Sequence, residues 1–264
     1  MAVVLGAEKL ETEEMQRIAA WTNLSETTFV LPPSSDAADY RLRIFTPRRE
    51  LPFAGHPTIG SAHAVIESGL AAPVNGKLRQ ECVAGCIDLT VERDEDGERI
   101  FIRAPQPKIS VVNSDHAQRL AAVLGSAQNP PLRIDVGVVW LIVELKDARA
   151  VDHATPDLTA ILKVSEETDA AGVTIFGRAD GADLHVRSFA PALGVSEDPV
   201  CGSGNASVAA YLIHNRLLSE SARYKARQGM NVGRAGQVSV RVEGHEIYFG
   251  GAAVTCLDGT LRVA

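Results

Sequence analysis

The alternation of polar and apolar residues predicts several β-strands along the chain. Residues 40–45 (Tyr-Arg-Leu-Arg-Ile-Phe) alternate strictly, as the residues of a half-buried strand do. The longest apolar run, Val136–Leu145, is too short for a bilayer-spanning helix and favours a buried strand. By the same criteria, strands are expected at residues 1–5, 24–31, 40–45, 87–92, 99–103, 132–145, 172–177, 183–189, 238–242 and 246–250.

Helical periodicity is confined to fewer segments. In residues 11–23, acidic residues occupy the first turn, and Met15, Ile18, Ala19 and Trp21 gather on one face. The other helices are expected at about residues 58–69, 115–124, 156–162 and 203–215. Many strands with occasional helices indicate an α+β fold rather than a doubly wound parallel sheet.

Two prolines, Pro105 and Pro107, interrupt the pattern and suggest a domain boundary. We therefore expect an N-terminal half of residues 1–106, joined by the C-terminal tail 251–264, and a C-terminal half of residues 107–250.

The two halves carry the same motifs in the same order. R-I-F-T-P at residues 43–47 and R-S-F-A-P at residues 187–191 share R-x-F-x-P. Each is followed, after a loop, by P-x-x-G-S and a helix of small residues. The segments 85–102 and 236–249 also correspond. Three matches in one order predict a duplicated architecture of two similar halves.

Such a duplication would set two loops, each ending at a helix N-terminus, across a cleft between the halves. Backbone N–H groups in the first turn of a helix lack intrahelical partners. We expect the amides of Gly60 and Ser61, and those of Gly202 and Ser203, to bind a carboxylate, which predicts a small anionic substrate. The alternative is that both are ordinary strand-to-helix turns that need glycine.

Composition narrows the class of protein. The 264 residues are 45% hydrophobic and 22% charged, and the net charge of −7 argues against a nucleic-acid or membrane partner. No signal peptide is visible, so a cytoplasmic location is expected. The four cysteines do not make a disulfide framework, and Cys82 and Cys86 lack the further ligands of a structural zinc site. Phosphate-binding loops and the G-x-S-x-G turn of hydrolases are absent.

Three longer segments carry distinctive motifs. They are N-L-S-E-T-T-F-V-L (23–31), R-I-F-T-P with E-L-P-F-A-G-H-P (43–57), and E-D-P-V-C-G-S-G (197–204). Together, and in this order, they resemble the PhzF-like phenazine-biosynthesis family. The resemblance implies a diaminopimelate-epimerase-like fold of two pseudo-symmetric halves, each a curved, mostly antiparallel sheet around a central helix. It also implies an isomerase that needs no cofactor or metal, and a homodimer.

The resemblance assigns roles to individual residues. Glu26 corresponds to the catalytic acid/base, and the expected substrate-binding residues are Gly55, His56, Asp198, Gly202 and Ser203. The chemistry of the residues agrees, because a carboxylate whose pKa is raised by partial burial, and by a nearby acid, can take and return a proton. The alternatives are a solvent-facing Glu26 on an edge strand and a loop His56 bonded to backbone.

Two departures from the family pattern change the expectations. Related epimerases carry a cysteine at each helix start, and the matching positions here are Ile59 and Cys201, so chemistry by two thiols is ruled out. Cys201 is expected either as a lone thiol whose pKa the helix start lowers or as a small pocket-lining residue. Family members usually begin with one more strand and a G-N-P turn before the segment matching residues 2–5, so either the start is truncated or the sheet is shorter here.

Three hypotheses follow in order of preference. The first is proton-transfer isomerisation by Glu26 on a small carboxylate-bearing substrate. The second is epimerisation or racemisation of an amino or hydroxy acid by Glu26 or Cys201. The third is a non-catalytic metabolite-binding protein on the same scaffold.

Overall fold

The chain divides into two compact units in a computed structural model, which describes residues 1–95, 97–179 and 183–262. Unit 1 contains Met1–Ile102 and the C-terminal residues from Gly250, and unit 2 contains Arg103–Phe249. The chain therefore passes from one unit to the other twice, once within each of two strands, Gly97–Arg103 (β7) and Glu246–Gly251 (β16).

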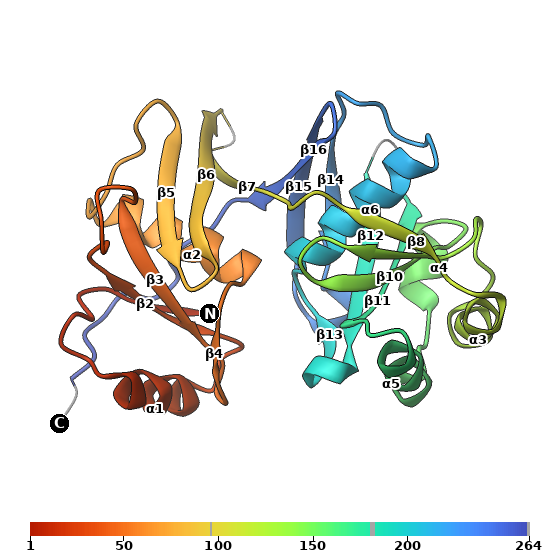
Figure 1. Cartoon of the computed structure of the whole chain (residues 1–264), viewed down its shortest axis with the longest axis horizontal. Helices are drawn as coiled ribbons and strands as arrows, with labels where there is room; N and C mark the ends of the chain where they lie inside the picture. Colours follow the sequence, from red (N-terminus) through yellow and green to blue (C-terminus); the bar gives the residue numbers. More distant parts are fainter. Residues whose placement is uncertain (96, 180–182, 263–264) are drawn as a thin grey trace. The chain divides into compact units, whose positions relative to one another are not determined.

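Unit 1 is a mixed sheet with a helix at its centre (Figure 1). Its strands follow the order β1-β2-β3-β5-β6-β7, and β4 pairs with β3. The pairs β1–β2 and β3–β5 are parallel, and the pairs β2–β3, β3–β4, β5–β6 and β6–β7 are antiparallel. Its elements before β7 are β1 (Ala2–Val4), α1 (Thr12–Thr22), β2 (Thr27–Leu31), β3 (Tyr40–Phe45), β4 (Glu50–Leu51), α2 (Gly55–Glu67), β5 (Lys77–Cys82) and β6 (Gly85–Asp94).

Unit 2 repeats this plan with additional helices. Its strands follow the order β16-β15-β14-β12-β11-β10-β9-β8, and β13 pairs with β12. Its first elements are β8 (Lys108–Val111), α3 (Ser114–Leu124), β9 (Leu132–Asp135), β10 (Val139–Glu144), α4 (Ala148–His153) and α5 (Leu158–Glu167). The remainder before β16 are β11 (Gly172–Arg178), β12 (Leu184–Ala190), η1 (Pro191–Leu193), β13 (Val195–Asp198), α6 (Gly202–His214), β14 (Arg223–Gln228), η2 (Met230–Val232) and β15 (Gly236–Glu243).

The strand pairing confirms the duplication. The parallel pair β1–β2 corresponds to β10–β11, and the parallel pair β3–β5 corresponds to β12–β14. The strand register is also the same in both halves. The phenylalanine of each R-x-F motif pairs with a residue near the start of the neighbouring strand: Phe45 with Thr27 of β2, and Phe189 with Val173 of β11. The two halves are thus pseudo-symmetric copies of one α+β plan.

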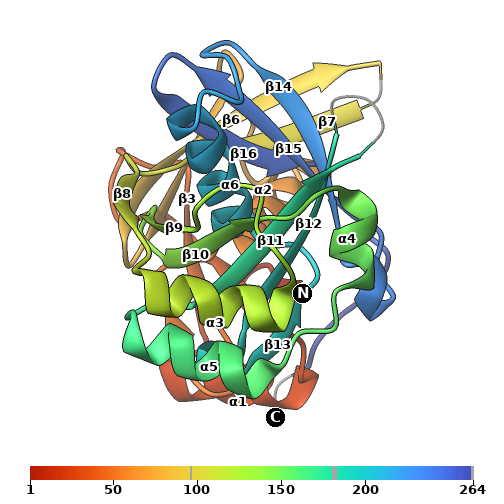
Figure 2. The same cartoon turned by 90° about the vertical axis from the view of Figure 1, so that its right-hand side faces the viewer.

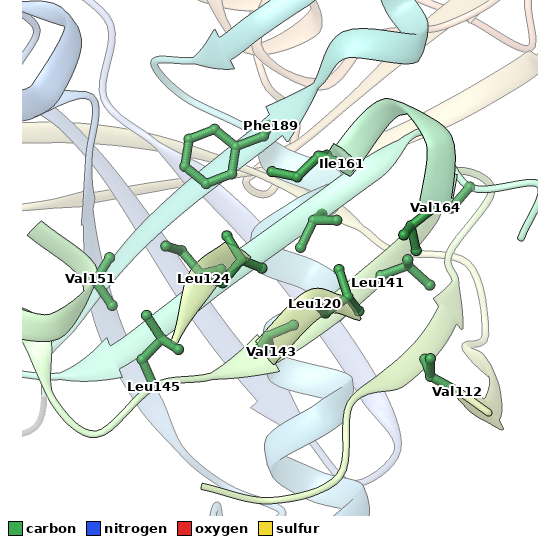
Figure 3. Close-up of a cluster of buried hydrophobic side chains, with 13 residues drawn as sticks. Val112, Leu120, Leu124, Leu141, Val143, Leu145, Val151, Ile161, Val164 and Phe189 are labelled. Atoms are coloured by element: carbon green, nitrogen blue, oxygen red, sulfur yellow. The ribbon is translucent and has the colours of Figure 1, made fainter. Parts of the chain in front are cut away.

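Each unit has its own apolar core. In unit 1, Met15, Ile18 and Ala19 of α1 pack on Phe29 and Phe45, whose rings meet edge to face. In unit 2, α3 and α5 lie side by side against the sheet (Figure 2). Figure 3 shows the cluster they cover, which includes Val112, Leu120, Leu124, Leu141, Val143, Leu145, Val151, Ile161, Val164 and Phe189.

Five strands were not predicted, namely β4, β5, β8, β13 and β14. Of these, β5 and β14 are equivalent in the repeat, as are β4 and β13. Both β5 (Lys-Leu-Arg-Gln-Glu-Cys) and β14 (Arg-Tyr-Lys-Ala-Arg-Gln) bury alternate residues and expose charged ones. Because the exposed residues are charged and few of the buried ones are strongly apolar, the alternation of buried and exposed positions is evident only once the strands are paired in the sheet. The single strand expected at residues 132–145 is instead two strands, because Gly137 (φ 89°) turns the chain between β9 and β10.

Candidate active site

Glu26 and His56 lie together in unit 1. The αL residue Asn23 (φ 52°) ends α1, and Glu26 follows just before β2 rather than within a strand. Oε2 of Glu26 lies 2.9 Å from Nε2 of His56, and the two side chains are 15% and 32% exposed. Oε2 is buried and accepts no well-directed hydrogen bond, so the contact is an ion-pair contact that acts when the imidazole carries a proton.

The electrostatics of Glu26 differ from the expectation. Burial is the largest influence and raises the pKa of its carboxyl, but His56, together with the nearby Ser25 hydroxyl, outweighs burial and lowers the pKa below its usual value. The predicted upward shift is therefore wrong in its net direction. Glu26 is a carboxylate at neutral pH, prepared to accept a proton before it donates one.

Helix α2 begins earlier than predicted, at Gly55 rather than at residue 58. Gly60 and Ser61 consequently lie in the second turn, where backbone amides bond to carbonyls of the preceding turn. The expected anion site at these two amides is wrong. The residues of the first turn are Gly55 and His56, and Ala54 at the N-cap has no side chain to cap their amides. The positive end of the helix therefore lies at His56.

A second group of predicted residues lies in unit 2, where β13 leads into α6. Oδ1 of Asp198 accepts the backbone N–H of Val200 at 2.9 Å. Gly202 and Ser203 are the first residues of α6, as predicted, and both are half-buried. The Ser203 hydroxyl accepts a hydrogen bond from the indole N–H of Trp140 at 3.0 Å.

Cys201 has a structural part in this turn. The thiol is 4% exposed and accepts the backbone N–H of Gly204 at 3.3 Å, so it caps α6. Burial raises its pKa to about 12, and the nearby Asp198 adds to the shift. The expectation that the helix start lowers the pKa of this thiol is wrong, because desolvation outweighs the helix dipole.

One residue that the sequence did not indicate holds the segment in place. Oε1 of Gln228, at the end of β14, accepts hydrogen bonds from the backbone N–H of Cys201 and from Nδ2 of Asn205, at 3.2 and 2.8 Å. Nε2 of Gln228 donates to the carbonyl of Asp198 at 2.8 Å. The distance along the chain explains why no local pattern pointed to it.

The repeated R-x-F motif has a structural explanation. Arg43 makes two hydrogen bonds to Glu50, at 2.8 and 2.7 Å, and lies over the ring of Phe45. Arg187 makes the equivalent pair with Glu197, at 3.0 and 2.8 Å, and lies over Phe189 in the same way. The Arg43–Glu50 pair thus connects β4 to β3, and the Arg187–Glu197 pair connects β13 to β12. Each short strand precedes the segment that carries the candidate residues.

Other features of the described residues bear on chemistry. No group of three or more His, Cys, Asp and Glu side chains among residues 1–95, 97–179 and 183–262 could hold a metal ion. Within those same ranges, no helix is long and apolar enough to cross a membrane.

The duplicated plan is that of isomerases with the diaminopimelate-epimerase type of fold. A solved phenazine biosynthesis protein of the PhzF family from Bacillus anthracis superposes with a TM-score of 0.83 at 27% identity. The match covers 94% of this chain and 88% of that one.

Sequence comparison identifies the family. Residues 1–259 match the phenazine biosynthesis-like protein family, PhzC-PhzF, and the chain belongs to this family. It is 34% identical to the trans-2,3-dihydro-3-hydroxyanthranilate isomerase of Pseudomonas aeruginosa, over 92% of this chain and 84% of that protein. It is 41% identical to a Schizosaccharomyces pombe protein named antisense-enhancing sequence 1, over 98% and 92%. The chain is thus an enzyme of an isomerase family.

Proposed function

We propose that the protein is a cofactor-independent isomerase that moves a proton on a small carboxylate-bearing substrate, with Glu26 as its general acid/base. The observation that carries the proposal is the Glu26 carboxylate, 15% exposed and 2.9 Å from His56 at the start of α2. A half-buried carboxylate can serve as a general acid/base when the proton of a bound substrate lies within its hydrogen-bond reach.

The mechanism follows from the ionisation of the pair. Because His56 keeps Glu26 ionised, the carboxylate first removes a proton from a carbon of the substrate, and the electron pair of that C–H bond is delocalised within the substrate. The carboxylic acid so formed then protonates a second carbon. The proton count and the oxidation state of the substrate are unchanged, as an isomerisation requires.

The residues of unit 2 suit recognition of the same substrate. The Ser203 hydroxyl and the first-turn amides of α6 are donors for a carboxylate. Asp198 is an acceptor for an amino or hydroxyl group. These are the functional groups in the name of the Pseudomonas relative, trans-2,3-dihydro-3-hydroxyanthranilate. We propose that both groups of residues act on one substrate.

The second hypothesis, epimerisation, is less well supported. It needs a base on each side of a carbon atom, and the positions that carry thiols in the related epimerases are Ile59 and Cys201. An isoleucine cannot carry a proton, and the pKa of about 12 leaves the Cys201 thiol protonated at neutral pH.

The test is turnover in D₂O with trans-2,3-dihydro-3-hydroxyanthranilate and a panel of small amino and hydroxy acids. Isomerisation places the new hydrogen, which is deuterium where the Glu26 carboxylic acid has exchanged with solvent, on a different carbon from the one that lost its proton. Epimerisation exchanges and inverts a single carbon. Glu26→Gln should lower kcat by about 10²–10⁴-fold while binding persists. Full activity of the folded Glu26→Gln variant would refute the assigned role. Ligand binding without turnover of any compound would favour the non-catalytic hypothesis.

A further inference from the structure

Among the described residues, Trp140 makes the one side-chain hydrogen bond that reaches Ser203 from outside the α6 turn. The tryptophan lies in β10 and is 2% exposed, and its indole Nε1–H donates to Oγ of Ser203 at 3.0 Å. A buried indole N–H requires an acceptor, and here the acceptor is the half-buried hydroxyl on the first turn of α6.

This hydrogen bond gives the Ser203 hydroxyl a direction. A serine hydroxyl has a single hydrogen to donate and can accept with its lone pairs. Because Oγ accepts from Trp140, the hydroxyl hydrogen must point elsewhere. Its other neighbour in the turn is Sγ of Cys201 at 3.7 Å, and a thiol is a weak acceptor. A carboxylate oxygen arriving at the turn is a much stronger acceptor and would take this hydrogen.

The repeat supplies an internal comparison. Ser61 is the equivalent serine of unit 1, but it is fully buried and its hydroxyl bonds to that of Thr28 at 2.8 Å. By strand register, Met1 occupies in unit 1 the place that Trp140 has in unit 2. Methionine has no N–H to donate. The two serines have therefore diverged, and the one that is partly exposed and accepts an indole N–H belongs to unit 2.

We propose that Trp140 is a positioning residue that holds the Ser203 hydroxyl as a hydrogen-bond donor to the carboxylate of the substrate. Unit 2 is then the carboxylate-recognition half, and unit 1 supplies the acid/base. The proposal rests on the substrate-binding role of Ser203 given above, and it concerns affinity rather than proton transfer.

The first experiment follows binding without any knowledge of the substrate. The chain has two tryptophans, and Trp21 is 74% exposed in α1, so Trp21→Phe leaves Trp140 as the only indole. Benzoate should change the Trp140 fluorescence in a saturable manner, and its uncharged amide, benzamide, should not. Ser203→Ala should weaken benzoate by about ten-fold or more, since a hydrogen bond to a charged acceptor is lost. Absence of saturable benzoate binding would overturn the proposal.

A double-mutant cycle then tests whether Trp140 acts through Ser203. Calorimetry should show that Trp140→Phe, which removes the N–H and keeps an aromatic ring, weakens benzoate by about ten-fold. Trp140→Phe combined with Ser203→Ala should bind no more weakly than Ser203→Ala alone. Unchanged affinity in a folded Trp140→Phe variant, or losses that add in full, would overturn the proposal.

Further controls distinguish the proposed role of Trp140 from a purely structural role, and from a failure of the role assigned to Glu26. If Trp140→Phe does not fold, benzothienylalanine at this position replaces the N–H by sulfur with almost the same shape, and the same ten-fold loss is expected. A lower Tm without a change in benzoate affinity identifies a structural role and overturns the proposal. Benzoate should still bind Glu26→Gln in a saturable manner, and Ser203→Ala should weaken it there by the same factor, so a failure of the proton-transfer proposal leaves this test intact.

Discussion

The buried pair Arg187–Glu197 allows a sharp test of how burial amplifies a charged contact. The two side chains are 7% and 8% exposed. Besides Glu197, the guanidinium donates to the carbonyls of Val151 and Ala154, at 3.1 and 2.8 Å, and so closes the end of α4. Arg187→Met would leave a buried carboxylate unpaired, which is expected to lower the free energy of unfolding by about 3–5 kcal/mol.

The repeat contains a matched control. Arg43 makes the same bidentate contact with Glu50 and lies over a phenylalanine ring in the same way. The side chains of Arg43 and Glu50 are, however, 16% and 27% exposed. Water can solvate the carboxylate that Arg43→Met leaves behind. We expect this substitution to lower the free energy of unfolding by about 1–2 kcal/mol.

Urea titrations followed by circular dichroism measure both losses on the same chain, and thermal scans provide a check. For a chain of this size, each kcal/mol lowers the Tm by about 2–4 °C. Arg187→Lys, which keeps the charge but not the forked geometry, should fall between the wild type and Arg187→Met. An Arg187→Met variant that loses no more stability than Arg43→Met would refute the reasoning, because the Arg187 pair is more buried and its guanidinium also holds two backbone carbonyls.

Three further predictions concern ionisation and packing. The folded-state pKa of Glu26 lies below its usual 4.5, so the unfolded chain binds more protons in this range. The wild type should be more stable than Glu26→Gln at pH values above the usual pKa of the carboxyl. This difference in the free energy of unfolding should disappear as the pH falls through the folded-state pKa. Urea titrations at neutral and acid pH check this, and a pH-independent difference contradicts it. The Cys201 thiol, buried and with a pKa of about 12, should resist iodoacetamide in the native state while the exposed Cys256 reacts, as peptide mass spectrometry would show. Native labelling of both at equal rates would count against the assigned burial. Gly204→Ala places a Cβ 2.7 Å from a buried serine hydroxyl and should cost about 1–3 kcal/mol in a urea titration. Gly259→Ala, with nothing within 4 Å, should be neutral, and equal stability of the two variants would refute the packing argument.

Much of the fold could be predicted because its evidence is local or repeated. The alternating residues of β3 and the long apolar run around β10 follow from strand periodicity. The R-x-F motifs marked the duplication, although their role as ion-pair anchors became evident only when Glu50 and Glu197 were located. The strands β5 and β14 escaped prediction because their exposed faces are charged, and only pairing within the sheet identifies them.

The candidate site also has features that could be predicted from the sequence and features that could not. The proximity of Glu26 to His56 agrees with the roles expected from the family motifs. The start of α2 at Gly55 did not follow from the pattern, since a Gly-His-Pro segment is compatible with a loop and with a first helical turn.

The sequence by itself determined the duplicated α+β plan, the family, and the identity of the residues at the candidate site. Only the tertiary structure decided how those residues behave. Cys201 stands at a helix start, which lowers a thiol pKa, yet burial raises it. Glu26 is half-buried, which raises a carboxyl pKa, yet His56 lowers it. Trp140 meets Ser203 across 63 residues of chain. Desolvation and contacts between distant segments set these properties, and both depend on atoms that no local pattern of residues specifies.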